Sequence, residues 1–107
     1  MTNPLPLLIA ICAILVLSVE GSRAGDIAAG EQRYNVNCVN CHGRAGKGMA
    51  SFPSIAGQDA DYIAERLRQY RAREKVGPNS AIMMSLVAEL TDEEIANLAV
   101  YVSTTFE

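Results

Sequence analysis

One five-residue segment constrains this chain more than any other: Cys38-Val39-Asn40-Cys41-His42. It contains the only histidine of the 107 residues and two of the three cysteines. Two cysteines three positions apart, followed directly by a histidine, form the attachment motif of c-type haem. We therefore expect a small domain that folds around a large flat ligand rather than around an all-protein core.

The chemistry of this attachment explains the spacing of the motif. At the end of a helix, Cys38 and Cys41 project toward one edge of a flat macrocycle, where each sulfur can form a thioether with a vinyl group. His42 then reaches the iron from the proximal side. One covalent haem c per chain is the resulting prediction.

Three other uses of the same residues fit less well. Structural zinc generally takes four ligands from two separated pairs, whereas this segment offers only three candidates and no other Cys or His occurs after residue 24. A thioredoxin-like dithiol accompanies a βαβ pattern, and the sequence has none. A simple disulfide between Cys38 and Cys41 would leave His42 without a role.

The N-terminus has an apolar run, Leu5–Val19, in which only Pro6 and Ser18 are not apolar. A membrane-spanning helix needs about 20 apolar residues, but a secretory signal needs only about 7–15, followed by a small-x-small cleavage site. Ser22-Arg23-Ala24 provides the small residues at both positions. The run is therefore typical of a signal peptide.

We predict that residues 1–24 are removed by cleavage after Ala24 and that a single mature domain, 25–107, is released into the periplasm without spanning the membrane. An uncleaved short anchor is the alternative, because no Lys or Arg precedes the apolar run. A lipid anchor at Cys12 is disfavoured by the bulky Ile11 before it.

The mature domain contains three segments with helical periodicity and no convincing alternating strand pattern. The helices are predicted over about Asp26–Asn37, over about Asp59–Lys75, and from Thr91 onward, where Thr91 and Glu94 can form a capping box. The connections, Gly43–Gly57 and the stretch around Pro78, are long and irregular. The residues spaced to form buried faces are Ile27, Gly30, Tyr34, Ile63, Leu67, Tyr70, Ile95, Leu98, Ala99 and Val102. This pattern predicts an all-α fold of three main helices, with loops wrapped around the ligand.

Charge restricts the partners of the chain. The net charge of −3 at pH 7 disfavours a nucleic-acid partner. The second helix carries a basic run that could dock an acidic protein: Arg66, Arg68, Arg71, Arg73 and Lys75. Acidic residues intersperse it, namely Asp59, Asp61, Glu65 and Glu74, so we favour a solvated helix face.

A second axial iron ligand has to come from a residue other than the single histidine. Methionine suits an electron carrier, because Met/His ligation raises the reduction potential. The mature candidates are Met49, Met83 and Met84. Met49 follows His42 by only seven residues, in a loop that has to turn away from the proximal face, whereas Met83 and Met84 come after a full helix. Spacing alone does not choose between these two, and any methionine can instead be core filler.

Taken together, the mature chain resembles class I c-type cytochromes, close to the single-haem halves of cytochrome c4 and to short c553-type cytochromes. The resemblance covers essentially all of residues 25–107. The matching segments are Cys38–Gly43, Phe52–Gln58, Ile82–Met84 and Ala88–Ile95.

The resemblance implies roles for particular residues. Met83 has the family's distance to Leu90 and is expected to be the distal ligand, although Ile82 replaces the first residue of the usual Met-Met pair. Pro53 is expected to accept the ring N–H of His42 through its backbone carbonyl. Gly30 and Tyr34 are expected to pack on the last helix, at Leu98 and Tyr101.

The resemblance also implies a function. With both axial positions filled by protein, the expected activity is one-electron transfer between redox proteins in the periplasm, not enzymatic catalysis. Cytochrome subunits of flavocytochrome c sulfide dehydrogenases share the Pro-Ser-Ile-Ala-Gly run, so a haem subunit partnered by a flavoprotein is the alternative. A haem gas sensor is a third interpretation and would require that Met83 not bind the iron.

Overall fold

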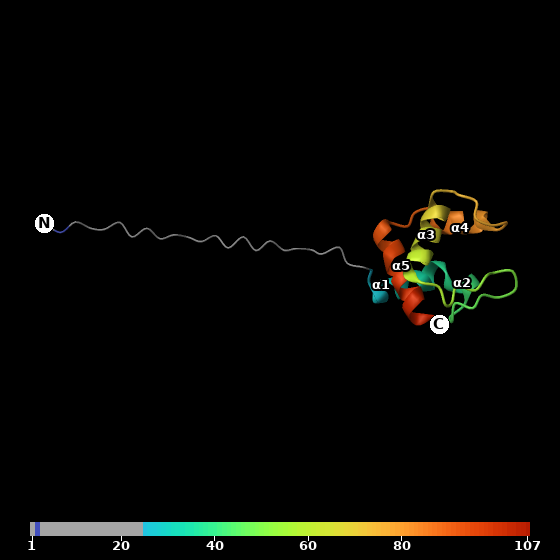
Figure 1. Ribbon diagram of the computed structural model, residues 1–107, viewed down its shortest axis with the longest axis horizontal. Helices are drawn as coiled ribbons and strands as arrows, with labels where there is room; N and C mark the ends of the chain where they lie inside the picture. Colours follow the sequence, from blue (N-terminus) through green and yellow to red (C-terminus); the bar gives the residue numbers. More distant parts are fainter. Residues whose placement is uncertain (1, 3–24) are drawn as a thin grey trace.

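The computed structural model describes Thr2 and residues 25–107, and the predicted signal peptide lies outside these residues except for Thr2. Residues 25–107 form five helices, and the described part of the chain contains no strand beyond a single bridge between Met49 and Phe52 (Figure 1). The helices are α1 (Ile27–Asn37), α2 (Val39–His42), α3 (Ala60–Arg71), α4 (Ser80–Val87) and α5 (Asp92–Thr105). The all-α prediction is confirmed, but α2 and α4 come in addition to the three main helices. None of the helices of residues 25–107 is long and apolar enough to cross a membrane.

The three longer helices begin at capping residues that the sequence makes visible. Asp26 and Asp59 each accept a hydrogen bond from the backbone N–H three residues on, at 3.1 and 2.8 Å. At α5 the predicted capping box is confirmed. Thr91 Oγ1 accepts from Glu94 N at 3.1 Å, and Glu94 Oε1 accepts from Thr91 N at 3.2 Å. These side chains satisfy N–H groups that have no partner within the helix.

The crossing of α1 over α5 forms one side of the domain. A Cβ atom at Gly30 would overlap the backbone carbonyl of Asn97 and lie 2.7 Å from Cβ of Tyr101, so only glycine allows the two helices to come this close. Gly30 thus packs on α5 at Tyr101, as predicted, and also at Asn97. Ile27, predicted to share this face, is instead 46% exposed.

An aromatic cluster continues this crossing toward the end of the chain. The ring of Tyr34 lies 5.5 Å from that of Tyr101 and 5.1 Å from that of Phe106, both in tilted arrangements. The Tyr34 hydroxyl donates to the carbonyl of Gly43 at 2.6 Å. This hydrogen bond joins α1 to the residue that ends α2. The remaining members of the core, from α3 to α5, are Ile63, Ala64, Leu67, Val87, Leu90, Ile95, Leu98, Ala99 and Val102.

Helix α3 ends at Arg71, four residues before the predicted end at Lys75. Arg73 has a φ of 62°, in the left-handed region, which terminates the helix. The side chain of Arg71 donates to the carbonyl of Leu90 at 3.0 Å and to Asp92 at 2.6 Å. The end of α3 is thereby fixed to the start of α5, and the chain turns back toward α4.

The stretch around Pro78 is irregular, as predicted, but the connection to α5 also contains a helix, α4, which begins at Ser80. The Oγ of Ser80, a buried residue, accepts hydrogen bonds from the backbone N–H groups of Val76 and Gly77 at 2.9 and 2.7 Å. These bonds close the turn that contains Pro78. Helix α4 packs against α3, so Met83 and its neighbours lie on a helix rather than in a loop.

Candidate functional site

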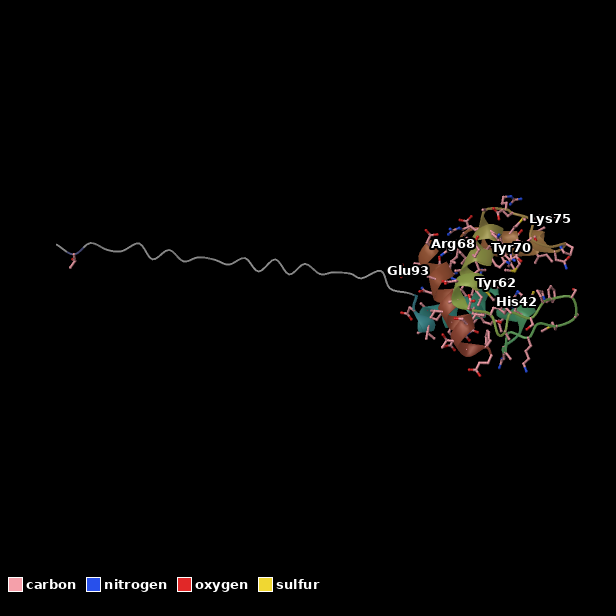
Figure 2. All side chains as sticks on the ribbon, in the orientation of Figure 1. His42, Tyr62, Arg68, Tyr70, Lys75 and Glu93 are labelled. Carbon is pink, nitrogen blue, oxygen red and sulfur yellow. The ribbon has the colours of Figure 1, made fainter. Side chains whose placement is uncertain are left out.

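A cavity of about 440 Å³ lies between α2, α3, α4 and the loop 51–58. Figure 2 labels His42 on α2, and Tyr62 and Tyr70 on α3, two of the helices that line it. Most of its walls are apolar, formed by Phe52, Pro53, Ile55, Ile63, Val76, Pro78, Ile82, Met83 and Leu86. A cavity this large and apolar in so small a domain is a binding site for a large, mostly apolar group.

Cys38 and Cys41 both line the cavity, are half-buried, and carry free thiols. Cys38 ends α1, and its carbonyl accepts the backbone N–H of His42 at 3.0 Å, which begins the single turn of α2. Burial raises the pKa of the Cys38 thiol to about 11; Arg33 opposes this rise and Cys41 adds to it. The Cys38 thiol is consequently protonated at neutral pH.

His42 is buried, and its ring is held by the loop on the far side of the motif. The Nδ1–H donates to the backbone carbonyl of Pro53 at 2.8 Å. A carbonyl oxygen can only accept, so the proton of the neutral ring is on Nδ1 and the lone pair of Nε2 is free. This arrangement leaves Nε2 available to bind a metal, and the same kind of hydrogen bond orients metal-ligating histidines in proteins.

The loop that carries Pro53 depends on a glycine that sequence reasoning did not single out. Gly48 has a φ of 72°, and a Cβ atom there would lie 2.7 Å from the carbonyl carbon of Pro53. Its backbone N–H donates to the carbonyl of His42 at 2.8 Å. Gly48 thus brings the Pro53 loop close to His42. Its position in the glycine-rich connection 43–57 was the available signal.

The three methionines of the described chain lie in different environments. Met83, on α4, lines the cavity and packs against the core, whereas Met84 is half-buried and outside the cavity lining. Successive residues of an α-helix point about 100° apart, so α4 directs one of the two into the cavity. Met49 is 53% exposed in the loop after the motif.

Two further groups of cavity residues were missed by sequence reasoning. The first holds α4 against the motif: Asn37 Nδ2 donates to the carbonyl of Leu86 at 3.3 Å. The second is a row on α3, Tyr62, Arg66 and Tyr70, spaced four residues apart and all lining the cavity. The four-residue spacing is a visible signal, but the basic run accounts for Arg66 and the buried face for Tyr70, so the row does not stand out in the sequence.

The donor set fits haem c. It consists of two thiols one helical turn apart, an imidazole with a free Nε2, and a thioether, all lining one apolar cavity. Within residues 25–107, no group of three or more His, Cys, Asp or Glu side chains is arranged to hold a bare metal ion.

Comparison with known proteins gives the same family throughout. The model of the family "Cytochrome c" matches residues 27–106. The chain is 42% identical over 82 residues to cytochrome c-554(548) of Halomonas halodenitrificans, covering 76% of this chain and 98% of that protein. It is also 34% identical to the thiosulfate dehydrogenase electron acceptor of Stutzerimonas stutzeri, covering 78% of this chain and 40% of that protein.

Among solved structures, the fold is similar to reduced recombinant cytochrome c4 from Pseudomonas stutzeri, with a TM-score of 0.63 and 26% sequence identity. The match covers 78% of this chain and 50% of that one, so the chain spans about half of a cytochrome c4. Members of this family hold haem c through a C-x-x-C-H segment, and Cys38 and Cys41 stand in such a segment here. The chain belongs to the cytochrome c family and is an electron-transfer protein, not an enzyme, with covalently bound haem c as its cofactor.

Proposed function

We propose that the cavity holds the haem through thioether bonds to Cys38 and Cys41, with His42 Nε2 and Met83 Sδ as the axial ligands of the iron. The observation that carries this proposal is the convergence of all four side chains on one cavity, although Met83 lies about forty residues from the motif. When bound, the haem iron supplies one-electron exchange between the ferrous and ferric states. The chain is thus a periplasmic one-electron carrier.

The protein's part on the proximal side is to orient His42. The hydrogen bond from Nδ1 to the Pro53 carbonyl keeps the ring in one tautomer and increases the basicity of Nε2. Cys41 and His42 lie on the same helical turn, which supports the use of one for attachment and the other as an axial ligand.

On the distal side, Met83 offers a soft, neutral thioether sulfur, which favours ferrous iron and raises the reduction potential. A protein ligand on each axial side also leaves no position for a small molecule. This supports an electron carrier over a gas sensor.

The partners of the carrier are other redox proteins. A relative of this chain is named as the electron acceptor of a thiosulfate dehydrogenase, which supports a role in receiving electrons from a dehydrogenase. Attachment as a permanent haem subunit of a flavoprotein remains the alternative. Co-purification of the tagged protein with a flavin-containing subunit would favour that alternative over a free carrier.

The predicted signal peptide, residues 1–24, supports the periplasmic location in this proposal. We expect the mature protein to begin at Gly25, after cleavage of the Ser22-Arg23-Ala24 site. N-terminal sequencing and intact mass of the protein from a periplasmic extract test this. A mass that still includes residues 1–24 would contradict it.

The axial assignment is tested by Met83→Ala beside its matched control, Met84→Ala. We expect Met83→Ala to lose the weak charge-transfer band at the red end of the ferric spectrum, to lower the potential and to admit carbon monoxide in the ferrous state. Met84→Ala should retain the band and exclude carbon monoxide. The reverse result would show that the neighbouring methionine is the ligand.

A further inference from the structure

The basic run on α3 is not uniform in its surroundings. Arg66 lines the cavity, and it is the only charged side chain among the cavity-lining residues. By contrast, Arg71 is bound to Leu90 and Asp92, and Arg68 lies 3.9 Å from Glu65 on the exposed surface. The interpretation of the run as a solvated face therefore does not extend to Arg66.

Neighbouring side chains hold Arg66 against the cavity. Its guanidinium carbon lies 5.1 Å from the ring centroid of Tyr62, and its Nη1 donates to Gln69 Oε1 at 2.7 Å. A guanidinium has five N–H donors, so the contact with Gln69 leaves most of them available. Tyr62 and Tyr70, one turn before and one turn after, line the same wall.

Haem c carries two propionate groups in addition to the positions that form thioethers. A carboxylate in or beside an apolar cavity is costly unless it is paired or hydrogen-bonded. The cavity lining offers one cation for this purpose, with a fork of donors that matches a carboxylate.

We propose that Arg66 binds a haem propionate and, by compensating its negative charge, raises the reduction potential of the protein. The inference rests on the proposed placement of the haem in this cavity. The ferrous centre has one positive charge fewer than the ferric centre, so a nearby uncompensated anion favours the ferric state. Arg66 thus acts by positioning the propionate and compensating its negative charge.

The structure provides a matched control. Arg68 is on the same helix, but its side chain is 51% exposed and outside the cavity lining. Figure 2 shows Arg68 and Tyr70 on opposite sides of α3. Arg66→Gln and Arg68→Gln make the same change in net charge, but only the first removes a cation from the cavity.

The test measures the reduction potential and the resonance Raman propionate bending band of the haem-loaded variants. We expect Arg66→Gln to lower the ratio of reduced to oxidised protein at fixed ambient potential by about threefold to tenfold, tenfold being about 59 mV for one electron. The propionate band should shift in this variant alone. Arg68→Gln should change the ratio by less than about twofold, because exposed charges are screened.

Equal shifts of potential in the two variants, or an unchanged propionate band in Arg66→Gln, would overturn the proposal. If Arg66→Gln fails to retain haem, Arg66→Lys carries the test. It keeps the charge but loses the planar fork, so the band should shift while the ratio stays within about twofold. An unmoved band in Arg66→Lys also counts against the proposal. Failure of the proposed axial ligation would be detected separately, because the unsubstituted protein would then lack the charge-transfer band.

Discussion

The two sides of this domain are built differently. Where α1 crosses α5, the chain packs on itself: Tyr34, Ile95 and Leu98 are the largest fully buried side chains, and Gly30 brings the backbones into contact. On the side of α4, Ser80 and Val87 are buried, but Ile82 and Leu86 are 49% and 38% exposed and line the cavity.

This difference teaches where each side obtains its stability. The α1–α5 crossing contains its own core and hydrogen bonds, and it needs no ligand to be complete. The α4 side presents apolar surface toward a cavity, and this surface is covered only when a large apolar group occupies it. We therefore expect the two sides to respond differently to the same perturbation.

The largest effect should follow from removing both thiols, with Cys38→Ala and Cys41→Ala combined. The variant should lose covalent haem, and α4 should lose amide-exchange protection while α1 and α5 retain part of theirs, because α4 contributes more residues to the cavity lining than α1 and α5 do. Hydrogen exchange followed by NMR or mass spectrometry measures this. Equal protection, or equal loss, in α4 and α5 would remove the distinction between the sides.

The next largest effect tests the α1–α5 crossing, which is the self-sufficient side because it needs no ligand to be complete. Gly30→Ala should destabilise the haem-loaded protein by about 2–3 kcal/mol, because the added methyl overlaps the Asn97 carbonyl and α1 must move. Gln32→Ala, at an exposed position of the same helix, should change stability by less than about 0.5 kcal/mol. Denaturant unfolding measures both. The visible spectrum should be unchanged in each, since neither residue contacts the axial ligands.

A smaller effect is expected where α1 is hydrogen-bonded to the end of α2, between the two sides of the domain. Tyr34→Phe removes the hydroxyl that donates to Gly43 at 2.6 Å and leaves that carbonyl only the longer bond from the backbone N–H of Gly46 at 3.3 Å, which should cost about 1 kcal/mol. Tyr101→Phe is the control on the same aromatic cluster. A loss in Tyr34→Phe no larger than in Tyr101→Phe would mean that the hydrogen bond to Gly43 contributes nothing specific.

The smallest effect is a pH dependence at the start of α5. The backbone N–H of Thr91 holds the pKa of Glu94 below its usual value, with Arg33 contributing in the same direction. A lowered folded pKa means that the carboxylate stabilises the fold above its unfolded pKa, about 4.5, and loses this as the pH falls through the folded value. Glu94→Gln should therefore cost about 0.5 kcal/mol at pH 7 and less at pH 3. Thermal unfolding at both pH values measures this, and an equal cost at both would exclude the linkage.

Much of the self-sufficient side could be predicted from the sequence. The α1 and α5 segments have a period of 3.6, and Asp26, Thr91 and Glu94 are capping residues at the expected places. Interactions between residues close in the sequence determine these features, so they can be predicted from the sequence alone. The attachment motif can be predicted for the same reason, since its three functional residues lie within five consecutive positions.

The ligand-dependent side was predicted less well, for a physical reason. Helix α4 is apolar on most of its surface, because one part packs on the core and another faces the cavity, so it has no polar face to mark its period. The end of α3 depends on a left-handed Arg73 and on the distant partners of Arg71. The direction of Arg66 into the cavity depends on tertiary packing and has no local signal beyond its spacing from Tyr62 and Tyr70.

The short spacing between Cys41 and His42 also sets the order in which the two proposed axial ligands reach their positions during folding. His42 needs almost no loop closure to reach its place beside Cys41, whereas Met83 closes a loop of about forty residues that includes the whole of α3. Chain entropy opposes the long closure much more than the short one, and α4 has few contacts of its own to offset it. During folding, His42 should take its position early and Met83 last. Under mild denaturant the same hierarchy runs in reverse, and Met83 should leave first.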